Sequence, residues 1–442
     1  MTEAPTKQTR FTSFDGTVSL STTHQRPDRL SHLEAPGSTT CRIARGGGYS
    51  YSASSFGENS LVQDMTRFNR FIDFNPDTLT LKLEVGVRLI ELMQWALPRQ
   101  LHFPVLPGYH LITVGGCVAA DVHGKNPYKD GTFSDWVKQL TVFHPQQGYL
   151  TCSRHENAEL FAMTCGGYGL TGVITDVTLQ LAPLPAPAIG LSQKRVNSLE
   201  YAQRELSACD ADIAYSWHDA TPGSSFGRGI VYIGHWANAA ARGRQMRYHP
   251  MTANSRASLP ISVWNRATAK AANTAILLHS QYGKDVTEKS ILDASFPFAS
   301  NPYFHMLFGK SGLRETQFLV ADDKIGECLE SLKQLICDTG APTMMLSLKR
   351  FKGTQKSLSM SGTGYLVALD CYRNNLTDVF MKNLDKLMLD MGGQPNLSKD
   401  SRISQDIAQL SVTNFGRFKQ YLFDYDGKRT MRSELSNRLG LL

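Results

Sequence analysis

The sequence predicts an α+β protein with two domains, and three observations support this. A chain of 442 residues is longer than one simple core normally accommodates. A stiff, proline-rich segment at residues 183–187 marks the expected domain boundary. The pattern also changes there: glycine-rich loops between short strands precede the segment, and a strand–helix–strand–strand–helix–strand order, typical of a split βαβ unit, follows it.

The residues before the boundary predict short strands and two helices. Strands are expected at residues 41–45, 61–65, 78–86, 136–144, 149–151 and 173–181, the fourth and fifth forming a hairpin. A helix over 88–97 places Leu89, Leu92, Met93 and Ala96 on one face and ends at a proline. A second, shorter helix is expected over 159–163.

The residues after the boundary predict strands at 315–321, 343–351 and 364–371 and helices at 323–338 and 376–391. The first helix is expected to bury Ile325, Leu329, Leu332 and Ile336. The second is expected to bury Val379, Phe380, Leu384, Leu387 and Met391. From the residues alone we expect a mixed sheet with its helices on one face.

Composition excludes several classes of protein. The hydrophobic share is 41% and the charged share 19%, which is ordinary for a globular chain. The eight cysteines are scattered without a CxxC pair, so we expect free thiols and no metal site. The N-terminus lacks the pattern of a secretory signal, and no apolar run is long enough to span a membrane. A cytoplasmic location is therefore expected.

Charge is distributed unevenly along the chain. The net charge is +7, and residues 221–284 contain no Asp or Glu. This stretch holds Arg228, Arg242, Arg244, Arg247, Arg256, Arg266, Lys270 and Lys284, with Trp236, Trp264, Ile261, Ile276, Leu277 and Leu278 among them. Such a mixture suits an anionic lipid surface, as at an inner membrane, although a solvated loop and helix in a basic protein fits it too. No nucleic-acid-binding module accompanies the charge, so nucleic acid is not expected as a partner.

Three glycine-rich segments stand out in the first half of the chain. They cover residues 45–51, residues 106–126 and residues 166–172, and each lies beside a predicted strand or helix. Glycine allows a backbone to take positive φ or to approach another group closely. One such segment is weak support for a ligand site, because glycine turns between strands are common. Three together predict one long cofactor held by several backbone loops, and their spacing fits neither a P-loop nor a Rossmann fingerprint.

These segments resemble the flavin-binding loops of the vanillyl-alcohol oxidase superfamily. The signature Asp121-Val122-His123-Gly124-Lys125-Asn126, with Lys399-Asp400-Ser401-Arg402, resembles a narrower, sugar-oxidising group within it. The resemblance implies an FAD-binding domain formed by both chain ends, residues 1–185 and 394–442. A substrate-binding cap domain with an antiparallel sheet, residues 186–393, is inserted between them. Many members attach FAD covalently through a histidine after the first glycine loop. Tyr49 occupies that place here, so we expect non-covalent FAD.

The resemblance also implies a set of cofactor-binding residues, expected to cradle the diphosphate and to line the rest of the FAD. They are Arg45, Gly46, Gly47, Gly48, Tyr49, Ser50, Tyr51, Pro107, Gly108, Val114, Gly115, Gly116, Cys117, Ala120, His123, Gly124, Asn126, Gly167, Gly169, Gly172, Val173, Ile174 and Lys399.

Catalytic and substrate-binding residues follow from the same resemblance. His123 and Lys399 are expected at the reacting centre: the lysine would stabilise anionic reduced flavin, and the histidine would orient or deprotonate the hydroxyl. From the residues alone, His123 could equally be a structural histidine and Lys399 a surface ion-pair partner. The substrate-binding set implied is Tyr51, His123, Lys125, Trp217, Gln317, Lys349 and Lys399. Lys349 suits a substrate phosphate.

The implied reaction is oxidation of a sugar hydroxyl to a ketone. The expected substrate is a polyprenyl-phosphoryl pentose, and a short-chain reductase partner would complete a 2′-epimerisation in envelope glycan synthesis. Departures at Leu366, Ala368 and Asn396, where relatives carry Asn, Cys and Tyr, leave the sugar open. Two alternatives are an oxygen-using aldose, alditol or lactone oxidase of the same superfamily and a non-catalytic flavoprotein scaffold.

Overall fold

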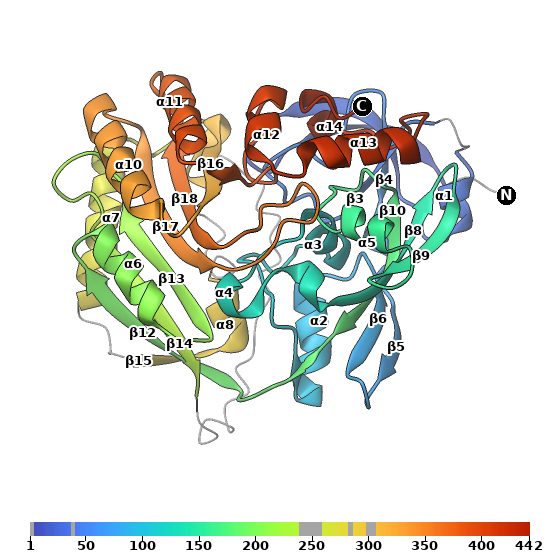
Figure 1. Ribbon diagram of the computed structural model, residues 1–442, viewed down its shortest axis with the longest axis horizontal. Helices are drawn as coiled ribbons and strands as arrows, with labels where there is room; N and C mark the ends of the chain where they lie inside the picture. The colour runs from blue at the N-terminus through green and yellow to red at the C-terminus, as the bar shows by residue number, and fades with distance from the viewer. Residues whose placement is uncertain (1–3, 37–39, 238–258, 282–285, 298–305) are drawn as a thin grey trace.

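A computed structural model describes residues 4–36, 40–237, 259–281, 286–297 and 306–442. Figure 1 shows an eight-stranded sheet beside two smaller sheets, which are built from the N-terminal part of the chain. The C-terminal helices lie against the two smaller sheets. Among the described residues, no helix has both the length and the apolar character needed to cross a membrane.

The N-terminal part, residues 4–183, forms two main sheets. The first has the strand order β1-β2-β4-β3, with β1 (Thr6–Thr12), β2 (Ser19–Gln25), β3 (Arg42–Arg45) and β4 (Leu61–Asp64). The second is antiparallel with the order β5-β6-β10-β8-β9, made of β5 (Phe71–Asn75), β6 (Thr80–Glu84), β8 (Val137–His144), β9 (Gly148–Ser153) and β10 (Val173–Gln180). The helices here are α1 (Ser31–Glu34), α2 (Leu89–Ala96), α3 (Val114–Ala120), α4 (Pro127–Asp130) and α5 (Ala158–Thr164). The hairpin, the strands and the two predicted helices are confirmed within a few residues.

The central glycine-rich segment contains a helix that the sequence did not predict. Residues 114–120 form α3, whose first turn is capped by Thr113 Oγ1 accepting from the Gly116 N–H at 3.3 Å. Gly115 lets this helix lie directly against β6 and the residues after it, because an added Cβ would come within 2.7 Å of the Val85 Cβ. Two adjacent glycines disfavour a helix intrinsically, so packing against the sheet outweighs propensity here.

The eight-stranded sheet holds the middle of the chain, and each of its strand pairs among the described residues is antiparallel. The expected mixed sheet is therefore wrong, and the antiparallel sheet implied by the family resemblance is found. The strands are β12 (Ala188–Val196), β13 (Ile213–Asp219), β14 (Gly229–Trp236), β15 (Val286–Ser290), β16 (Leu313–Val320), β17 (Thr343–Phe351), β18 (Gly364–Tyr372) and β19 (Gln394–Pro395). The helices are α6 (Leu199–Ala208), α7 (Arg266–Gln281), α8 (Ile291–Ser295), α10 (Ile325–Thr339) and α11 (Thr377–Asp390).

This sheet is built from two copies of one topology. Starting at the junction between β13 and β17, the strand orders are β13-β14-β12-β15 and β17-β18-β16-β19, so each copy runs second, third, first, fourth in chain order. The second copy is the predicted split βαβ unit. The sequence analysis did not predict the first copy, part of which lies in the acid-free residues 221–284. Of that segment, the expected membrane-contact residues Arg242, Arg244, Arg247, Arg256 and Lys284 lie outside the described residues.

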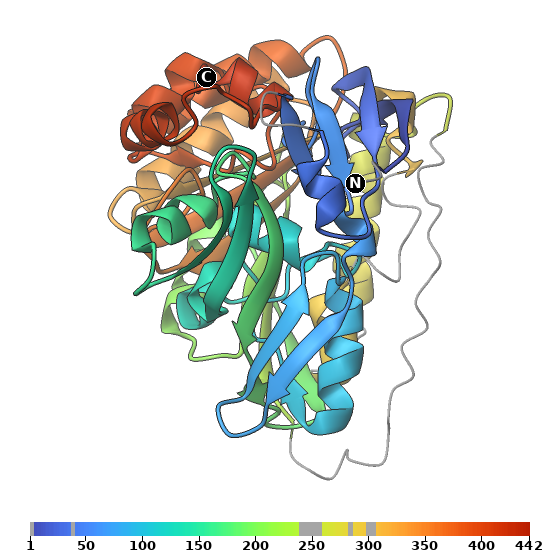
Figure 2. The ribbon, with the colours of Figure 1, turned by 90° about the vertical axis from the view of Figure 1, so that its right-hand side faces the viewer.

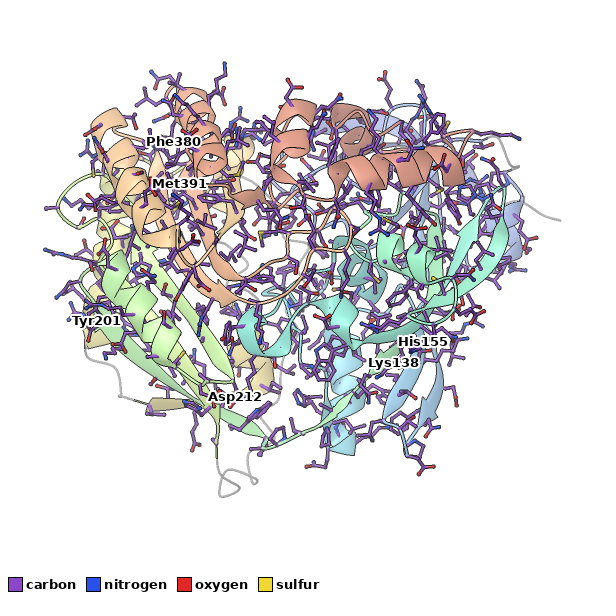
Figure 3. All side chains as sticks on the ribbon, viewed as in Figure 1. Lys138, His155, Tyr201, Asp212, Phe380 and Met391 are labelled. Carbon is purple, nitrogen blue, oxygen red and sulfur yellow. The ribbon has the colours of Figure 1, made fainter. Side chains whose placement is uncertain are left out.

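Three helices, α6, α10 and α11, pack on one face of the sheet in a shared core with Val231, Val367 and Leu369. Figure 3 labels Phe380, a buried residue of α11 in this core, and Met391 at its end. Val379 is 60% exposed, which corrects its predicted burial, and Leu387 and Met391 are only half-buried. The helix instead turns Thr377, Met381, Leu384 and Met388 inward with Phe380. Ile276 of α7 lines the cavity on the other face, so the helices are not confined to one face.

The C-terminal segment packs on the N-terminal part of the chain, as Figure 2 shows for the red helices beside the blue strands. It contains α12 (Gln405–Ser411), α13 (Phe415–Tyr425) and α14 (Glu434–Arg438). Phe418, Leu435 and Leu439 share one core with Ile43 and Phe56. The Arg42 N–H donates to the Thr430 carbonyl at 2.8 Å, and the Arg432 N–H donates to the Arg42 carbonyl at 2.9 Å. Both chain ends therefore contribute to one core.

Asp426 fastens this segment to β8. Its carboxylate accepts from Thr430 Oγ1, the Met431 N–H and Gln146 Nε2 at 2.8–3.0 Å and lies 3.6 Å from His144 Nε2. Burial raises the pKa of this carboxyl, but the bonds to His144, Thr430 and Met431 outweigh burial and lower the pKa to about 2. Because the folded-state pKa is depressed, the resulting stability is fully present above pH 3.8 and is lost as the pH falls toward 2.

We therefore expect Asp426→Ala to lower the free energy of unfolding by about 2–4 kcal/mol at neutral pH, since it leaves several buried donors unpaired. Denaturant unfolding followed by circular dichroism measures this change. Asp424→Ala is the control, because Asp424 is exposed in the last turn of α13 and accepts a hydrogen bond from Gln420, and it should change stability by less than about 0.5 kcal/mol. Equal effects of the two substitutions would contradict the fastening role.

Candidate active site

A cavity of about 530 Å³ lies between the N-terminal sheets and the eight-stranded sheet. The three glycine-rich segments, far apart in the sequence, all reach it. The predicted cofactor residues that line it are Arg45, Gly46, Gly47, Gly48, Tyr49, Ser50, Tyr51, Pro107, Gly108, Gly115, Gly116, Ala120, His123, Gly169, Gly172, Ile174 and Lys399. Val114, Cys117, Gly124, Asn126, Gly167 and Val173 are not among the lining residues; Val114, Cys117 and Val173 are core residues instead.

Close approach between backbones explains why the segments carry glycine. A Cβ on Gly46 would collide with Thr113 Oγ1, so the first segment can meet the cap of α3 only without a side chain. The third segment bonds to the other end of the same helix, where the Gly166 and Tyr168 N–H groups donate to the Val118 and Ala119 carbonyls at 3.0 and 2.8 Å. The helix α3 thus joins the three segments around one space.

The opposite wall comes from the eight-stranded sheet, through side chains two residues apart on each strand. Tyr215 and Trp217 of β13, Glu315 and Gln317 of β16, Met345, Ser347 and Lys349 of β17, and Ala368 and Asp370 of β18 line the cavity. Because side chains alternate between the faces of a strand, the intervening Leu346, Leu348 and Leu369 face the helices instead. All seven predicted substrate-binding residues lie on the cavity wall.

Lys399 enters the cavity from the loop after β19. This loop is held against the first glycine segment, since the Ser398 carbonyl accepts from the Tyr51 and Ser52 N–H groups at 3.0 and 3.2 Å. The Lys399 ammonium lies 3.2 Å from Glu315 Oε1 and 4.1 Å from the centre of the Tyr51 ring. Lys399 is therefore an ion-pair partner, which was one of the two alternatives left open by the sequence. The ion pair lies inside the predicted site and not on the outer surface.

His123 is part of a hydrogen-bonded chain. Its Nδ1 lies 3.2 Å from the Gly124 carbonyl, which also accepts from Lys349 Nζ at 3.3 Å, and its ring is hydrogen-bonded to the Gln317 side chain. Because a carbonyl only accepts, Nδ1 carries the proton and Nε2 is the acceptor. Gln317 in turn donates from Nε2 to Glu315 at 2.5 Å and accepts from Asn396 Nδ2 at 3.0 Å.

Burial and neighbouring cations shape the charges in the cavity. Burial, followed by repulsion from Lys349, lowers the pKa of His123 to about 3, so its imidazole is neutral at pH 7. Burial and then Lys399 lower the pKa of Lys349 to about 8. Burial and both other lysines lower the pKa of Lys125 well below its usual range. Three amines gathered in a buried space favour an anionic ligand, and an imidazole with so low a pKa is better suited to orienting a hydroxyl than to removing its proton.

Among the cavity residues that sequence reasoning missed are Tyr215, Tyr232, Glu315 and Asp370. A signal for two of them was present. Glu315 is two residues before Gln317, and Asp370 is two residues after Ala368, so the alternation of the strands placed each on the same face as a residue already considered. The two tyrosines lie on β13 and β14, in the copy of the repeated unit that was not foreseen.

The buried histidines predict how stability depends on pH. Burial is the largest cause lowering the pKa of His102, His110 and His218 to about 4 and that of His123 to about 3. Between those values and 6.5 the unfolded chain binds protons that the folded chain does not, so stability falls as the pH drops through this window. We expect the melting temperature to decrease steadily from pH 6.5 to about 4.

Replacing His218, which is hydrogen-bonded to the Gly227 carbonyl and Ser216 Oγ and does not line the cavity, should flatten this dependence. In His218→Gln the slope of unfolding free energy against pH should decrease by up to about 1.4 kcal/mol per pH unit. His155→Gln, at an exposed histidine labelled in Figure 3, is the control and should leave the slope unchanged. An unaltered slope in His218→Gln would show that this imidazole does not remain neutral on folding.

Comparison with known proteins agrees with the geometry of this cavity. Residues 35–153, which include the first two glycine segments, match the family described as FAD binding domain. The chain is 27% identical over 415 residues to decaprenylphosphoryl-beta-D-ribose oxidase of Mycolicibacterium smegmatis, covering 90% of this chain and 89% of that protein. These two similarities support the vanillyl-alcohol oxidase type of flavoprotein that the glycine segments resemble. The chain is an FAD-dependent oxidoreductase that acts on a CH–OH group.

Two further relatives match different shares of the chain. An uncharacterized protein of Streptomyces coelicolor is 26% identical, with 80% of this chain and all of that protein covered. D-lactate dehydrogenase of Anaerostipes hadrus is 30% identical, with 31% of this chain and 30% of that protein covered.

The structure itself fits FAD. At Gly46 and Gly48 an added Cβ would collide with neighbouring side chains, so at these two positions the backbone lines the cavity without a side chain in front of it. The glycine segments would hold the diphosphate and the body of the cofactor through backbone N–H groups, and Lys399 would stabilise negative charge on it. When bound, FAD supplies the two-electron acceptor for the oxidation.

Proposed function

We propose that this flavoprotein oxidises a hydroxyl of a polyprenyl-phosphoryl pentose to a ketone, at the 2′ position. The observation that carries the proposal is the group of three lysines, Lys125, Lys349 and Lys399, on the wall of one buried cavity. An isolated buried ammonium group is costly, and an anionic substrate would relieve the repulsion among the three. The similarity to an oxidase named for decaprenylphosphoryl-ribose supports the same substrate class.

The residues divide the work between binding and chemistry. Lys125 and Lys349 would bind the phosphate, and Trp217, Tyr215 and Tyr232 would contact the sugar and the first prenyl unit. Neutral His123 would position the reacting hydroxyl through Nε2, because its Nδ1 is bonded to the Gly124 carbonyl. Lys399 would hold a positive charge where negative charge develops during the oxidation.

The keto product would require a second enzyme if the pathway is an epimerisation. In this proposal a short-chain reductase returns a hydride to the other face of the ketone. The described part of residues 221–284 would bring the enzyme to the lipid surface, since Ile261 and Leu278 are exposed and Arg266 and Lys270 lie among them. Flotation with anionic vesicles that weakens as salt rises would support that contact.

Anaerobic reduction of the bound flavin tests the function. A panel of short-chain polyprenyl-phosphoryl sugars is mixed with the FAD-loaded enzyme, and absorbance is followed at the flavin band. Bleaching with a phosphoryl pentose, but not with free aldoses, alditols or lactones, is the expected result. Bleaching by free sugars or lactones with peroxide formed in air would favour the alternative oxidase. Bleaching by none of these compounds would contradict the proposal and favour a scaffold.

The mode of attachment of FAD is a separate prediction. Because Tyr49 stands where many relatives carry the linking histidine, we expect FAD to be released when the enzyme is precipitated with acid. A colourless pellet and a yellow supernatant are the expected outcome. A yellow pellet that stays coloured after washing would show a covalent bond and would overturn this prediction.

A further inference from the structure

Two carboxyl groups face each other in the cavity on neighbouring strands. Glu315 of β16 and Asp370 of β18 are directly opposed in the antiparallel register. Directly opposed residues have Cβ atoms about 5 Å apart, and both of these side chains point to the cavity. Little of either side chain is exposed: Asp370 is 5% exposed, and the Glu315 side chain is 10% exposed. Two carboxylates this close cannot easily both be ionised.

Their surroundings distinguish the two groups. Glu315 is paired with Lys399 at 3.2 Å, accepts from Gln317 Nε2 at 2.5 Å and is hydrogen-bonded to Tyr51. For Asp370, no hydrogen bond or ion pair of the carboxyl group is found within the described part of the chain. Burial and the neighbouring Glu315 raise the pKa of Asp370, while Lys399 partly opposes them. These surroundings favour the neutral form of Asp370 beside a Glu315 that is paired with Lys399.

We propose that Asp370 and Glu315 form a carboxyl pair that holds one proton, and that Asp370 binds a non-reacting hydroxyl of the substrate. This inference rests on the proposed sugar oxidation and names a specificity residue for it. A protonated carboxyl both donates and accepts a hydrogen bond, which matches a hydroxyl group. Glu315 is paired with Lys399 and hydrogen-bonded to Gln317, and these bonds fix the positions of its carboxylate and of the Lys399 ammonium.

The carboxyl pair and the lysines occupy different regions of the cavity wall. The free carboxyl lies on β18, whereas Lys125 and Lys349 come from the loop after α3 and from β17. A substrate with one anionic group and a neutral polyhydroxylated ring would satisfy both regions. A second anionic group at the ring would meet the Glu315 carboxylate, so the pair disfavours sugar acids and other hydroxy acids.

Kinetics with deoxy sugars test the contact. The panel consists of the sugar that bleaches the flavin and its analogues, each lacking one non-reacting hydroxyl. We expect Asp370→Ala to lower kcat/KM for the parent sugar by about 10-fold. Asp370→Asn, which keeps a donor and an acceptor, should stay within about 3-fold of the unmodified enzyme. Asp390→Ala, at the exposed end of α11, is the matched control and should have no effect.

One deoxy analogue should behave differently from the others. For that analogue Asp370→Ala should cause no further loss, because the hydroxyl that Asp370 binds is already absent. If Asp370→Ala lowers kcat/KM by the same factor for the parent and every analogue, Asp370 does not contact a hydroxyl and the proposal fails. A purely structural role would also give loss in Asp370→Asn without selectivity among the analogues.

Infrared difference spectroscopy tests the shared proton without turnover. The FAD-loaded enzyme at pH 7.5 should show the carbonyl band of a protonated carboxylic acid that is missing in Asp370→Asn. Absence of such a band would overturn the shared proton even if sugar oxidation is established. If the band is present but no polyprenyl-phosphoryl sugar is oxidised, the proposed substrate fails and the carboxyl pair stands, and the deoxy panel then uses the free polyol that bleaches the flavin.

Discussion

Replacing Lys399 with methionine is expected to slow flavin reduction by substrate about 100- to 1,000-fold. The ammonium of Lys399 is among the described charges on the cavity wall and is held there by Glu315 and the Tyr51 ring. Replacing it removes a positive charge that would offset the negative charge developing as the substrate is oxidised. Stopped-flow absorbance at the flavin band measures the rate, and the midpoint potential of the bound flavin should become more negative.

Three variants separate the charge of Lys399 from its packing. Lys399→Arg should retain more of the rate than Lys399→Met, because it keeps a positive charge in an altered geometry. Lys386→Met, at an exposed lysine of α11, should not change the rate or the potential. Lys399→Met combined with Glu315→Gln tests whether the loss comes from the unpaired Glu315 carboxylate. An unchanged midpoint potential in Lys399→Met would contradict an electrostatic role, whatever the rate.

Replacing Gly46 with alanine is expected to weaken FAD binding by about 10- to 100-fold, the cost of forcing one extra methyl into a closed contact. The added Cβ would meet Thr113 Oγ1, a short side chain that caps α3 and cannot move far. The first glycine segment and α3 would separate, and the cavity between them would lose its shape. Titration of the apoprotein with FAD, followed by flavin fluorescence, measures the affinity.

A second substitution should restore part of that binding. Thr113→Ala removes the atom that the new methyl meets, so Gly46→Ala with Thr113→Ala should bind FAD more tightly than Gly46→Ala alone. Thr113→Ala by itself loses a helix cap, worth about 1 kcal/mol, and sets the limit of recovery. Gly326→Ala, at a position of α10 with open space around it, is the control and should not affect FAD. Failure of the double variant to exceed the single one would show that this contact is not what Gly46 protects.

The sequence predicted the elements between residues 313 and 391 within a few residues because hydrophobic periodicity is a local property. The second copy of the repeated unit alternates strands and amphipathic helices clearly, and β16, α10, β17, β18 and α11 were found as expected. In α11 the apolar residues do not define a single face, and the predicted buried face was partly wrong. Val379 and Met381 compete for the same turn of α11, and only packing against the sheet selects Met381 for the core.

The local sequence pattern did not predict the first copy of the repeated unit or helix α3. Residues 221–284 lack acids and carry aromatics among cations, a composition that predicts a membrane-contact surface. In the structure, part of this stretch instead forms strand β14 of the eight-stranded sheet. Gly115 and Gly116 disfavour a helix, yet α3 forms because Gly115 allows close contact with the chain around Val85. Tertiary packing outweighs intrinsic propensity in both places.

By itself, the sequence determined the chemistry available to this protein: glycine at each position where a backbone must come close, lysines at 125, 349 and 399, and the motif around His123 that marks the flavin-binding family. Only the tertiary structure decided that these residues share one space, that Glu315 and Asp370 oppose each other inside it, and that His123 is neutral. The reason is physical. Residue identity sets which groups can bond or ionise, whereas burial and proximity, which set the pKa of each group, exist only once distant segments have packed together.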